Sequence, residues 1–180
     1  MLFPRIKLIL PVILLFLLLI VPAAASAERI RATLTGYEEV PPVSTEAGGQ
    51  LRGRISNDEQ SIEWSLTYSG LEGAVQQADI HFAQAGVNGG IAVFLCTNLN
   101  NGPAGTQGCP QSGTIQGTIM AADVSAGANP PFGAIGQRIE QGELDELIKA
   151  IRAGTAYANV HSAGATGGEI RGQIRSSRRD

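Results

Sequence analysis

Short segments in which apolar and polar residues alternate, separated by turn residues, recur along most of the chain. In the clearest of them, every second residue from Ile62 to Tyr68 is apolar, which places these side chains on one face of a strand. All 23 glycines follow residue 27, and so much glycine argues against a helical bundle, because glycine destabilises helix interiors. We expect strands at residues 29–35, 50–55, 61–69, 78–83, 91–96, 114–120, 155–161 and 169–174.

Glycines inside the expected strands indicate that the sheet is curled. Residues 48–55 match residues 167–174 at five of eight positions, and both copies carry an interior glycine. Such a glycine marks a bulge, a tight bend or a close backbone approach. We therefore expect one all-β domain over residues 28–175, an antiparallel β-sandwich or flattened Greek-key barrel of about seven to nine strands. A flexible tail is expected at residues 176–180.

One segment has a helical period instead. Its apolar residues occupy the i, i+3, i+4 and i+7 positions of a helix: Leu144, Leu147, Ile148 and Ile151. Acidic residues lie in its first turn and basic residues near its end, as the helix dipole favours. We expect one short helix at residues 143–152, covering an open end of the sheet structure.

The first 27 residues have the pattern of a secretory signal peptide. Arg5 and Lys7 precede an apolar run over residues 8–21, and residues 25–27 (Ala-Ser-Ala) form a small-x-small cleavage site. The alternative is an uncleaved membrane anchor, but a spanning helix needs about 20 apolar residues. We expect cleavage after Ala27, no transmembrane segment in the mature chain, and a secreted or periplasmic protein.

The mature chain is acidic. Removing the leader takes away two of the 13 Lys and Arg residues and none of the 16 Asp and Glu residues. Nucleic acid is therefore not an expected partner, since binding to phosphates needs a concentrated basic face.

Two cysteines bracket a loop with almost nothing to bury. Cys96 and Cys109 flank a stretch rich in Asn, Gly, Pro, Thr and Gln. In an oxidising compartment this pattern predicts a structural disulfide. The rival interpretation, a redox-active or metal-binding pair, lacks a CxxC spacing or a nearby histidine.

Three blocks of the sequence resemble a known family. They are Leu-Thr-Gly-Tyr-Glu-Glu-Val-Pro-Pro-Val at 34–43, Ala-Asp-Ile-His to Gly-Val-Asn-Gly-Gly at 78–90, and Ala-Gly-Thr-Ala-Tyr-Ala-Asn-Val-His to Gly-Gln-Ile at 153–174. Together they resemble the CHRD domain, first described as a repeat in chordin and also found singly in exported microbial proteins. The resemblance covers about residues 31–174. It implies an extracellular module with no established enzymatic role; chordin itself is an extracellular protein that binds growth factors.

Both histidines of the chain fall inside these blocks, which makes them candidate metal ligands. Asp79 and His81 lie two residues apart on an expected strand and so share a face, and His161 ends another expected strand. The two segments are loosely similar to the copper-bearing strands of copper-zinc superoxide dismutases, which are Greek-key sandwiches. The CHRD family commonly reads His-x-His where this chain has Asp79. Two imidazoles and a carboxylate suit zinc, copper or iron.

A simpler interpretation of the histidines is hydrogen bonding. A histidine near a sheet rim often bonds only to a backbone carbonyl or a nearby carboxylate, and Glu39 and Glu169 are available for this. Under this interpretation no cofactor is expected.

A proline pair marks a second candidate site. Val40, Pro41 and Pro42 follow Glu39 in a segment that rejects ladder hydrogen bonds. One interpretation is an extended segment at a sheet edge that prevents further strands from pairing there. The other is a binding surface for a partner at Glu39–Pro42.

No complete catalytic set appears in the sequence, because no nucleophile motif or phosphate-binding loop is present. The first hypothesis is therefore an exported, non-catalytic CHRD-like module that binds an extracellular protein or a surface polymer. The rival is a metal-binding protein that uses Asp79, His81 and His161. A purely structural envelope protein is the third.

Overall fold

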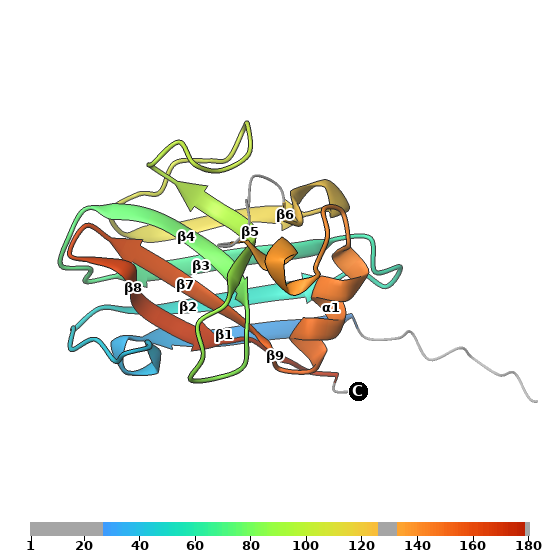
Figure 1. Ribbon diagram of the computed structural model, residues 1–180, viewed down its shortest axis with the longest axis horizontal. Coiled ribbons are helices and arrows are strands. Elements are labelled where there is room, and N and C mark those ends of the chain that lie inside the picture. The colour runs from blue at the N-terminus through green and yellow to red at the C-terminus, as the bar shows by residue number, and fades with distance from the viewer. Residues whose placement is uncertain (1–26, 126–132, 179–180) are drawn as a thin grey trace, which may run out of the picture.

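Nine strands in the described part of the chain form one antiparallel sheet that curls into a nearly closed barrel (Figure 1). The structure is a computed structural model that describes residues 27–125 and 133–178. The predicted signal peptide lies outside these residues, apart from Ala27. The strands are β1 (Glu28–Thr35), β2 (Gly48–Ile55), β3 (Ile62–Ser69), β4 (Val75–Phe82), β5 (Gly90–Thr97), β6 (Gly113–Ile119), β7 (Ala156–Ser162), β8 (Ala165–Gln173) and β9 (Arg175–Ser176). The helical elements are η1 (Gly36–Glu38), η2 (Ala121–Asp123), η3 (Ala134–Gln137) and α1 (Leu144–Arg152).

The strand order gives the barrel a Greek-key connectivity. The strands run β5-β4-β7-β8-β1-β2-β3-β6, with β9 added to β1. The chain passes from β3 to β4 and from β6 to β7 without pairing these strands, so both connections cross between distant parts of the sheet. Every expected strand is present with its ends shifted by a few residues, and the predicted all-β antiparallel class is confirmed.

The two halves of the barrel differ in how their outer faces are covered. In β1 and β3 buried and exposed residues alternate, and the alternate apolar residues from Ile62 to Tyr68 all enter the core, as predicted. In β7 every residue is buried, and β4 and β8 each contain five consecutive buried residues. The outer face of β4, β7 and β8 is therefore covered by protein, so polar side chains there are withdrawn from water.

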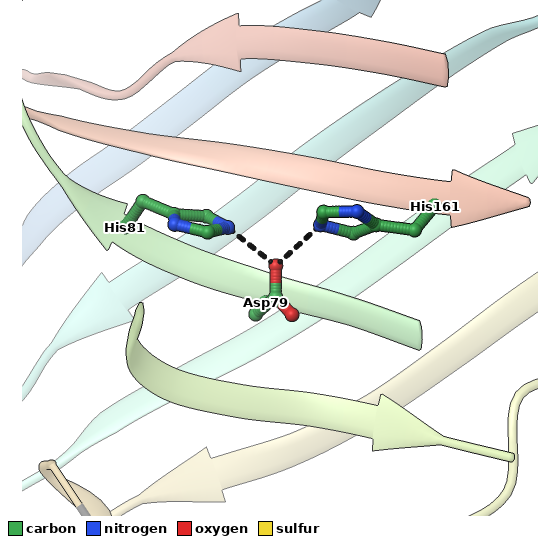
Figure 2. Close-up of side chains that lie close together, drawn as sticks. All are labelled: Asp79, His81 and His161. Atoms are coloured by element: carbon green, nitrogen blue, oxygen red, sulfur yellow. Dashed lines mark hydrogen bonds and ion pairs between the residues drawn. The ribbon is translucent and has the colours of Figure 1, made fainter. Parts of the chain in front are cut away.

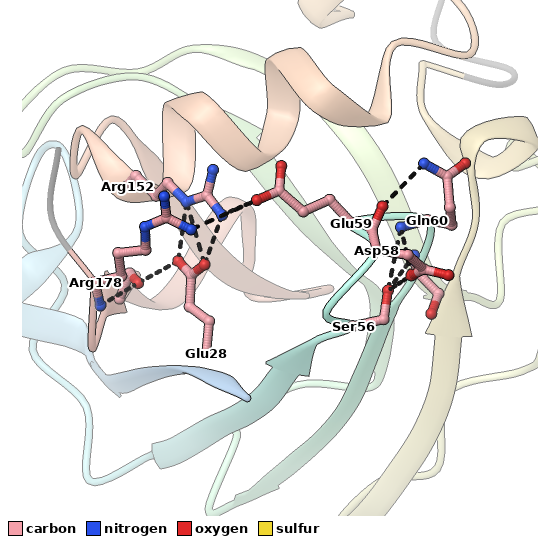
Figure 3. Close-up of polar contacts among 9 residues, drawn as sticks. Glu28, Ser56, Asp58, Glu59, Gln60, Arg152 and Arg178 are labelled. Carbon is pink, nitrogen blue, oxygen red and sulfur yellow. Dashed lines mark hydrogen bonds and ion pairs between the residues drawn. The ribbon is translucent and has the colours of Figure 1, made fainter. Parts of the chain in front are cut away.

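The predicted helix is confirmed as α1, which lies at one end of the barrel (Figure 1). Its apolar stripe is buried, with Leu147, Ile148 and Ile151 fully enclosed. Arg152, its last residue, reaches the Glu28 carboxylate at 2.7 Å and also pairs with Glu59 (Figure 3). These ion pairs tie the helix to the start of β1 and to the turn between β2 and β3.

The two edges of the sheet, β5 and β6, are joined by covalent and side-chain links. The predicted disulfide between Cys96 in β5 and Cys109 is confirmed. The Gln107 side-chain amide donates to the Leu95 carbonyl of β5 and to the Gln116 carbonyl of β6, both at 3.2 Å. The loop that the disulfide closes therefore bridges the open seam of the barrel.

Two segments lie in positions that differ from expectation. Ser176 and Ser177, which fall within the expected flexible tail, continue the sheet: Ser176 pairs with Ile30, and the Ser177 amide donates to the Arg29 carbonyl at 2.8 Å. The segment containing Val40 to Pro42 joins β1 to β2 and does not lie along β5 or β6, the edge strands. The segment belongs to no strand and lies between η1 and β2.

Candidate metal centre

Asp79, His81 and His161 come together on the outer face of β4 and β7 (Figure 2). His81 Nε2 lies 2.7 Å from Asp79 Oδ1, and His161 Nε2 lies 3.1 Å from the same oxygen. The centroids of the two imidazole rings are 5.9 Å apart. The structure thus brings all three of the candidate ligands to one carboxylate oxygen.

Irregular pairing surrounds each of these residues. The β4–β5 register shifts between Ala78 and Asp79 and again between Ile80 and His81. The β7–β8 register shifts between Val160 and Ser162, on either side of His161. Such bulges bend a strand and re-aim its side chains, which accounts for the convergence of rings from two strands.

The cluster is buried although it lies outside the barrel core. Asp79 is 0% exposed, His81 7% and His161 6%. Ile80 and Val160, at the alternating positions, belong to the hydrophobic core. The cluster therefore occupies the covered outer face of the sheet, where little water competes for its polar atoms.

Backbone carbonyls determine which nitrogen of each ring carries a proton. His81 Nδ1 lies 2.9 Å from the Gly89 carbonyl oxygen, and His161 Nδ1 lies 3.0 Å from the Thr166 carbonyl oxygen. A carbonyl can only accept, so both Nδ1 atoms must be donors. In a neutral imidazole the Nε2 atom then carries a lone pair. Both lone pairs would point at a carboxylate oxygen, which also cannot donate.

This convergence of acceptors has a limited set of solutions. Either two protons are held among the Asp79 carboxyl and the two Nε2 atoms, or a cation lies among the three groups. A carbonyl that holds Nδ1–H and leaves Nε2 as the ligand atom is the usual outer-shell arrangement around a metal-bound histidine. The ligand atoms of Asp79, His81 and His161 lie within 4.8 Å of one another. A tetrahedral zinc ion with bonds of about 2.0–2.1 Å separates its ligands by roughly 3.3 Å, so the separations between the ligand atoms would have to change by up to about 1.5 Å.

A chain of side-chain amides orients Asp79. Gln77 Nε2 donates to Asp79 Oδ2 at 2.7 Å, and Asn101 Nδ2 donates to Gln77 Oε1 at 2.7 Å. Thr97 Oγ1 in turn donates to Asn101 Oδ1 at 2.6 Å. This network occupies the second carboxylate oxygen and leaves Oδ1 directed at the histidines.

The charges in the cluster shift one another's protonation. Burial opposes ionisation of Asp79, but the adjacent His161 and His81 hold the pKa of its carboxyl well below the usual range. Burial likewise lowers the pKa of His161, yet the Asp79 carboxylate overcomes this and raises that pKa to about 9. The site therefore favours a negatively charged Asp79 facing positive charge.

The sequence did not single out the aromatic and cationic side chains that flank His81. The Tyr157 ring stacks on the His81 ring at 4.7 Å with an interplanar angle of 4°. On the other side of Tyr157, the Arg171 guanidinium carbon lies 3.4 Å from the ring centroid. Arg171 is 1% exposed and donates to the Gln84 and Val87 carbonyls. The one sequence signal was that Tyr157 and Arg171 lie inside the third family block.

Neither of the two glutamates considered as histidine partners forms a hydrogen bond to a ring in the described residues. Glu169 Oε1 accepts from Thr45 Oγ1 and from the Glu72 amide, each at 2.9 Å. Glu39 is 5% exposed, and burial raises the pKa of its carboxyl although His161 and Arg171 oppose this. The hydrogen bonds of the rings go instead to Asp79 and to backbone carbonyls.

The candidate partner-binding segment is only partly accessible. Pro41 and Pro42 are exposed and Val40 is half-buried, whereas Glu39 is buried. Asn88 Nδ2 donates to the Val40 carbonyl at 2.9 Å, so this segment packs against the loop that supplies Gly89. The structure thus makes Glu39 part of the cover over the cluster.

Comparison with family models decides the relationship that the three blocks suggested. Residues 30–174 match the model of the CHRD domain. The chain belongs to the CHRD domain family. Comparisons with curated proteins and with solved structures gave no match. Within residues 27–125 and 133–178, this CHRD protein has no helix with the length and apolar character needed to cross a bilayer.

Proposed function

We propose that this protein is an exported CHRD module that binds one divalent transition-metal ion, zinc or copper, through Asp79, His81 and His161. The observation that carries this proposal is the bonding of both Nδ1 atoms to backbone carbonyls, which directs two Nε2 atoms at one carboxylate oxygen. A single divalent cation would satisfy all three acceptors. Imidazole and carboxylate are ligands that both zinc and copper accept.

The enclosure of the cluster supports binding over catalysis. The histidine side chains are 9% and 8% exposed and that of Asp79 is 0% exposed. Metal sites that turn over a substrate keep an open coordination position, which this cover restricts. A metal here would link β4 to β7 and hold the Gly89 and Thr166 loops over the sheet, which is a stabilising role.

Export is supported by the cysteines and by the position of β1. A disulfide persists in oxidising compartments outside the cytoplasm. Cleavage after Ala27 would make Glu28 the first residue, and Glu28 is also the first residue of β1. N-terminal sequencing of protein recovered from the periplasm or the medium tests this: we expect Glu28, and a chain that retains residues 1–27 would contradict it.

Metal content decides the central proposal. Protein without a histidine tag, exported by its own leader, is analysed by plasma mass spectrometry before and after dialysis against a chelator. We expect about one zinc or copper ion per chain, sharply reduced in His81→Gln and in His161→Gln. Lys149→Gln, which alters an exposed residue of α1, is the control and keeps the metal.

A metal-free result would return the protein to the first hypothesis, a module that binds a partner without a metal. In that case the cluster is a buried hydrogen-bonded group in which Asp79 faces the two imidazoles without a metal. Metal-free protein whose melting temperature is unchanged by added zinc or copper overturns the metal proposal.

A further inference from the structure

Five exposed arginines lie together on the outer face of β1, β2 and β9. Arg31 in β1 is directly opposite Arg52 in β2 and directly opposite Arg175 in β9. Two residues away along the strands, Arg29 is directly opposite Arg54. The five residues, which we call the arginine face, are Arg29, Arg31, Arg52, Arg54 and Arg175.

One carboxylate lies beside the arginine face: Glu63 in β3 is directly opposite Arg54. In the part of the chain that the structure describes, none of its five residues forms an ion pair within 4.0 Å. Like charges directly opposite one another on a sheet are destabilising. The chain as a whole is acidic, with a formal charge of −3. The opposed arginine pairs of this face therefore do not favour folding.

Two hollows adjoin the arginine face, one on each side of Arg52. The first has a volume of about 480 Å³ and is lined by four of the arginines together with Gln50 and Ser176. The second has a volume of about 500 Å³, includes Glu63 in its lining, and adds the side chains of Ser65, Gln116 and Thr118. The surface thus combines guanidinium groups with hydroxyl and amide groups, over strands β9, β1, β2, β3 and β6.

We infer that the arginine face binds an extended acidic polysaccharide. Adjacent strands lie about 4.8 Å apart and alternate residues along a strand about 6.7 Å apart, so the guanidinium groups form a closely spaced array. Each can bind a carboxylate or sulfate through a planar pair of N–H donors. The neighbouring hydroxyl and amide groups suit the uncharged hydroxyls of sugars.

The same surface is a poor match for other polyanions and for proteins. Binding of single-stranded nucleic acid relies on aromatic side chains that stack on bases. The aromatic residue that lines the second hollow, Trp64, is 7% exposed and packs inward against Gly117. Protein interfaces are anchored by aromatic residues as well as arginine, and neither hollow presents an exposed aromatic side chain. This inference does not depend on the metal site.

Binding to defined polyanions tests the inference. The untagged full chain is titrated with alginate, which carries carboxylates, with heparin, which carries sulfates, and with single-stranded DNA. Titrations are made in chelator at several salt concentrations. Arg31→Gln/Arg52→Gln/Arg175→Gln removes three charges from the arginine face, and Arg138→Gln/Lys149→Gln/Arg178→Gln removes three charges elsewhere.

We expect alginate or heparin to bind the unaltered chain and the control variant alike. The arginine-face variant should bind at least tenfold more weakly, with a salt slope shallower by about 2, since each lost contact removes close to one released counterion. Its melting temperature should equal or exceed that of the unaltered chain, because opposed like charges are gone. Equal binding by the two variants, no binding at 50 mM salt, or DNA binding as tight as polysaccharide binding would each overturn the inference.

Discussion

Truncation of the shared carboxylate, Asp79→Ala, is the most informative perturbation of the cluster. The side chain is fully buried and touches three polar partners: Gln77 Nε2, His81 Nε2 and His161 Nε2. Removing one member of a buried charged cluster costs about 3–5 kcal/mol, because the remaining groups lose their partner without regaining water. We therefore expect the free energy of unfolding to fall by about this amount in chelator.

Zinc should increase the difference in the free energy of unfolding between the unaltered chain and Asp79→Ala. A ligand at 100 times its dissociation constant stabilises the native state by about 2.7 kcal/mol, which the unaltered chain gains and Asp79→Ala does not. Guanidinium denaturation with and without zinc measures both terms. Gln77→Ala is the matched control, expected to cost about 1–2 kcal/mol and to keep the zinc response.

Two results would refute this reasoning. One is a loss below 1 kcal/mol in chelator, and the other is a zinc response in Asp79→Ala equal to that of the unaltered chain. If Asp79→Ala does not fold, Asp79→Asn keeps the side-chain volume and is expected to lose most of the zinc response.

Three further predictions concern the pH dependence of stability, the contact of Gly168 with Glu39, and the Cys96–Cys109 disulfide. The Asp79 carboxylate overcomes the effect of burial and raises the pKa of His161 from 6.5 to about 9. In chelator, the stabilisation of the fold by protonated His161 is therefore complete below pH 6.5 and is lost as pH rises through 9. Urea denaturation across this range should show the free energy of unfolding falling by about 3 kcal/mol, and His161→Gln should lack this fall. Gly168 has a φ of +124°, and a Cβ there would collide with Glu39 Oε1. Gly168→Ala should therefore lower the free energy of unfolding by about 1–3 kcal/mol in the same assay. Gly167 has open space around it, so Gly167→Ala should leave the free energy of unfolding unchanged. Replacing Cys96 and Cys109 by serine should lower the free energy of unfolding by about 3 kcal/mol, from loop closure alone; unchanged stability would contradict it.

The alternation of apolar residues was sufficient to predict β3, since one of its faces meets water. It was also sufficient for α1, whose apolar stripe is buried as expected. The interior glycines of the repeat were interpreted correctly in part. A Cβ at Gly172 would collide with the Thr33 carbonyl, and a Cβ at Gly53 would collide with the Glu63 carbonyl, so both mark close backbone approach.

Other features depend on pairing that the sequence does not display. Strand β9 consists of only two polar residues, Arg175 and Ser176, so no apolar alternation predicts it. The arginine face becomes apparent only when the pairing places Arg31 between Arg52 and Arg175. Arginine is a residue expected at the surface. The burial of Arg171 follows from its contact with Tyr157, which periodicity cannot predict.

The candidate cluster was predictable at the level of residues but not of atoms. The two-residue spacing of Asp79 and His81 predicts a shared face, and the third family block adds His161. The groups that bind the Nδ1 atoms are the backbone carbonyls of Gly89 and Thr166, and a backbone carbonyl leaves no mark of this role in the sequence. The protonation of the rings therefore required the positions of the loops.

Histidine-selective NMR tests the central claim most directly. The chain contains two histidines, so long-range 1H–15N correlation of untagged protein shows two rings and both are easily assigned. With one equivalent of zinc, we predict that both rings are protonated at Nδ1 and that both Nε2 resonances shift to the range of metal-bound nitrogen. Nδ1 without a proton in either ring, or spectra that zinc leaves unchanged, would contradict the account.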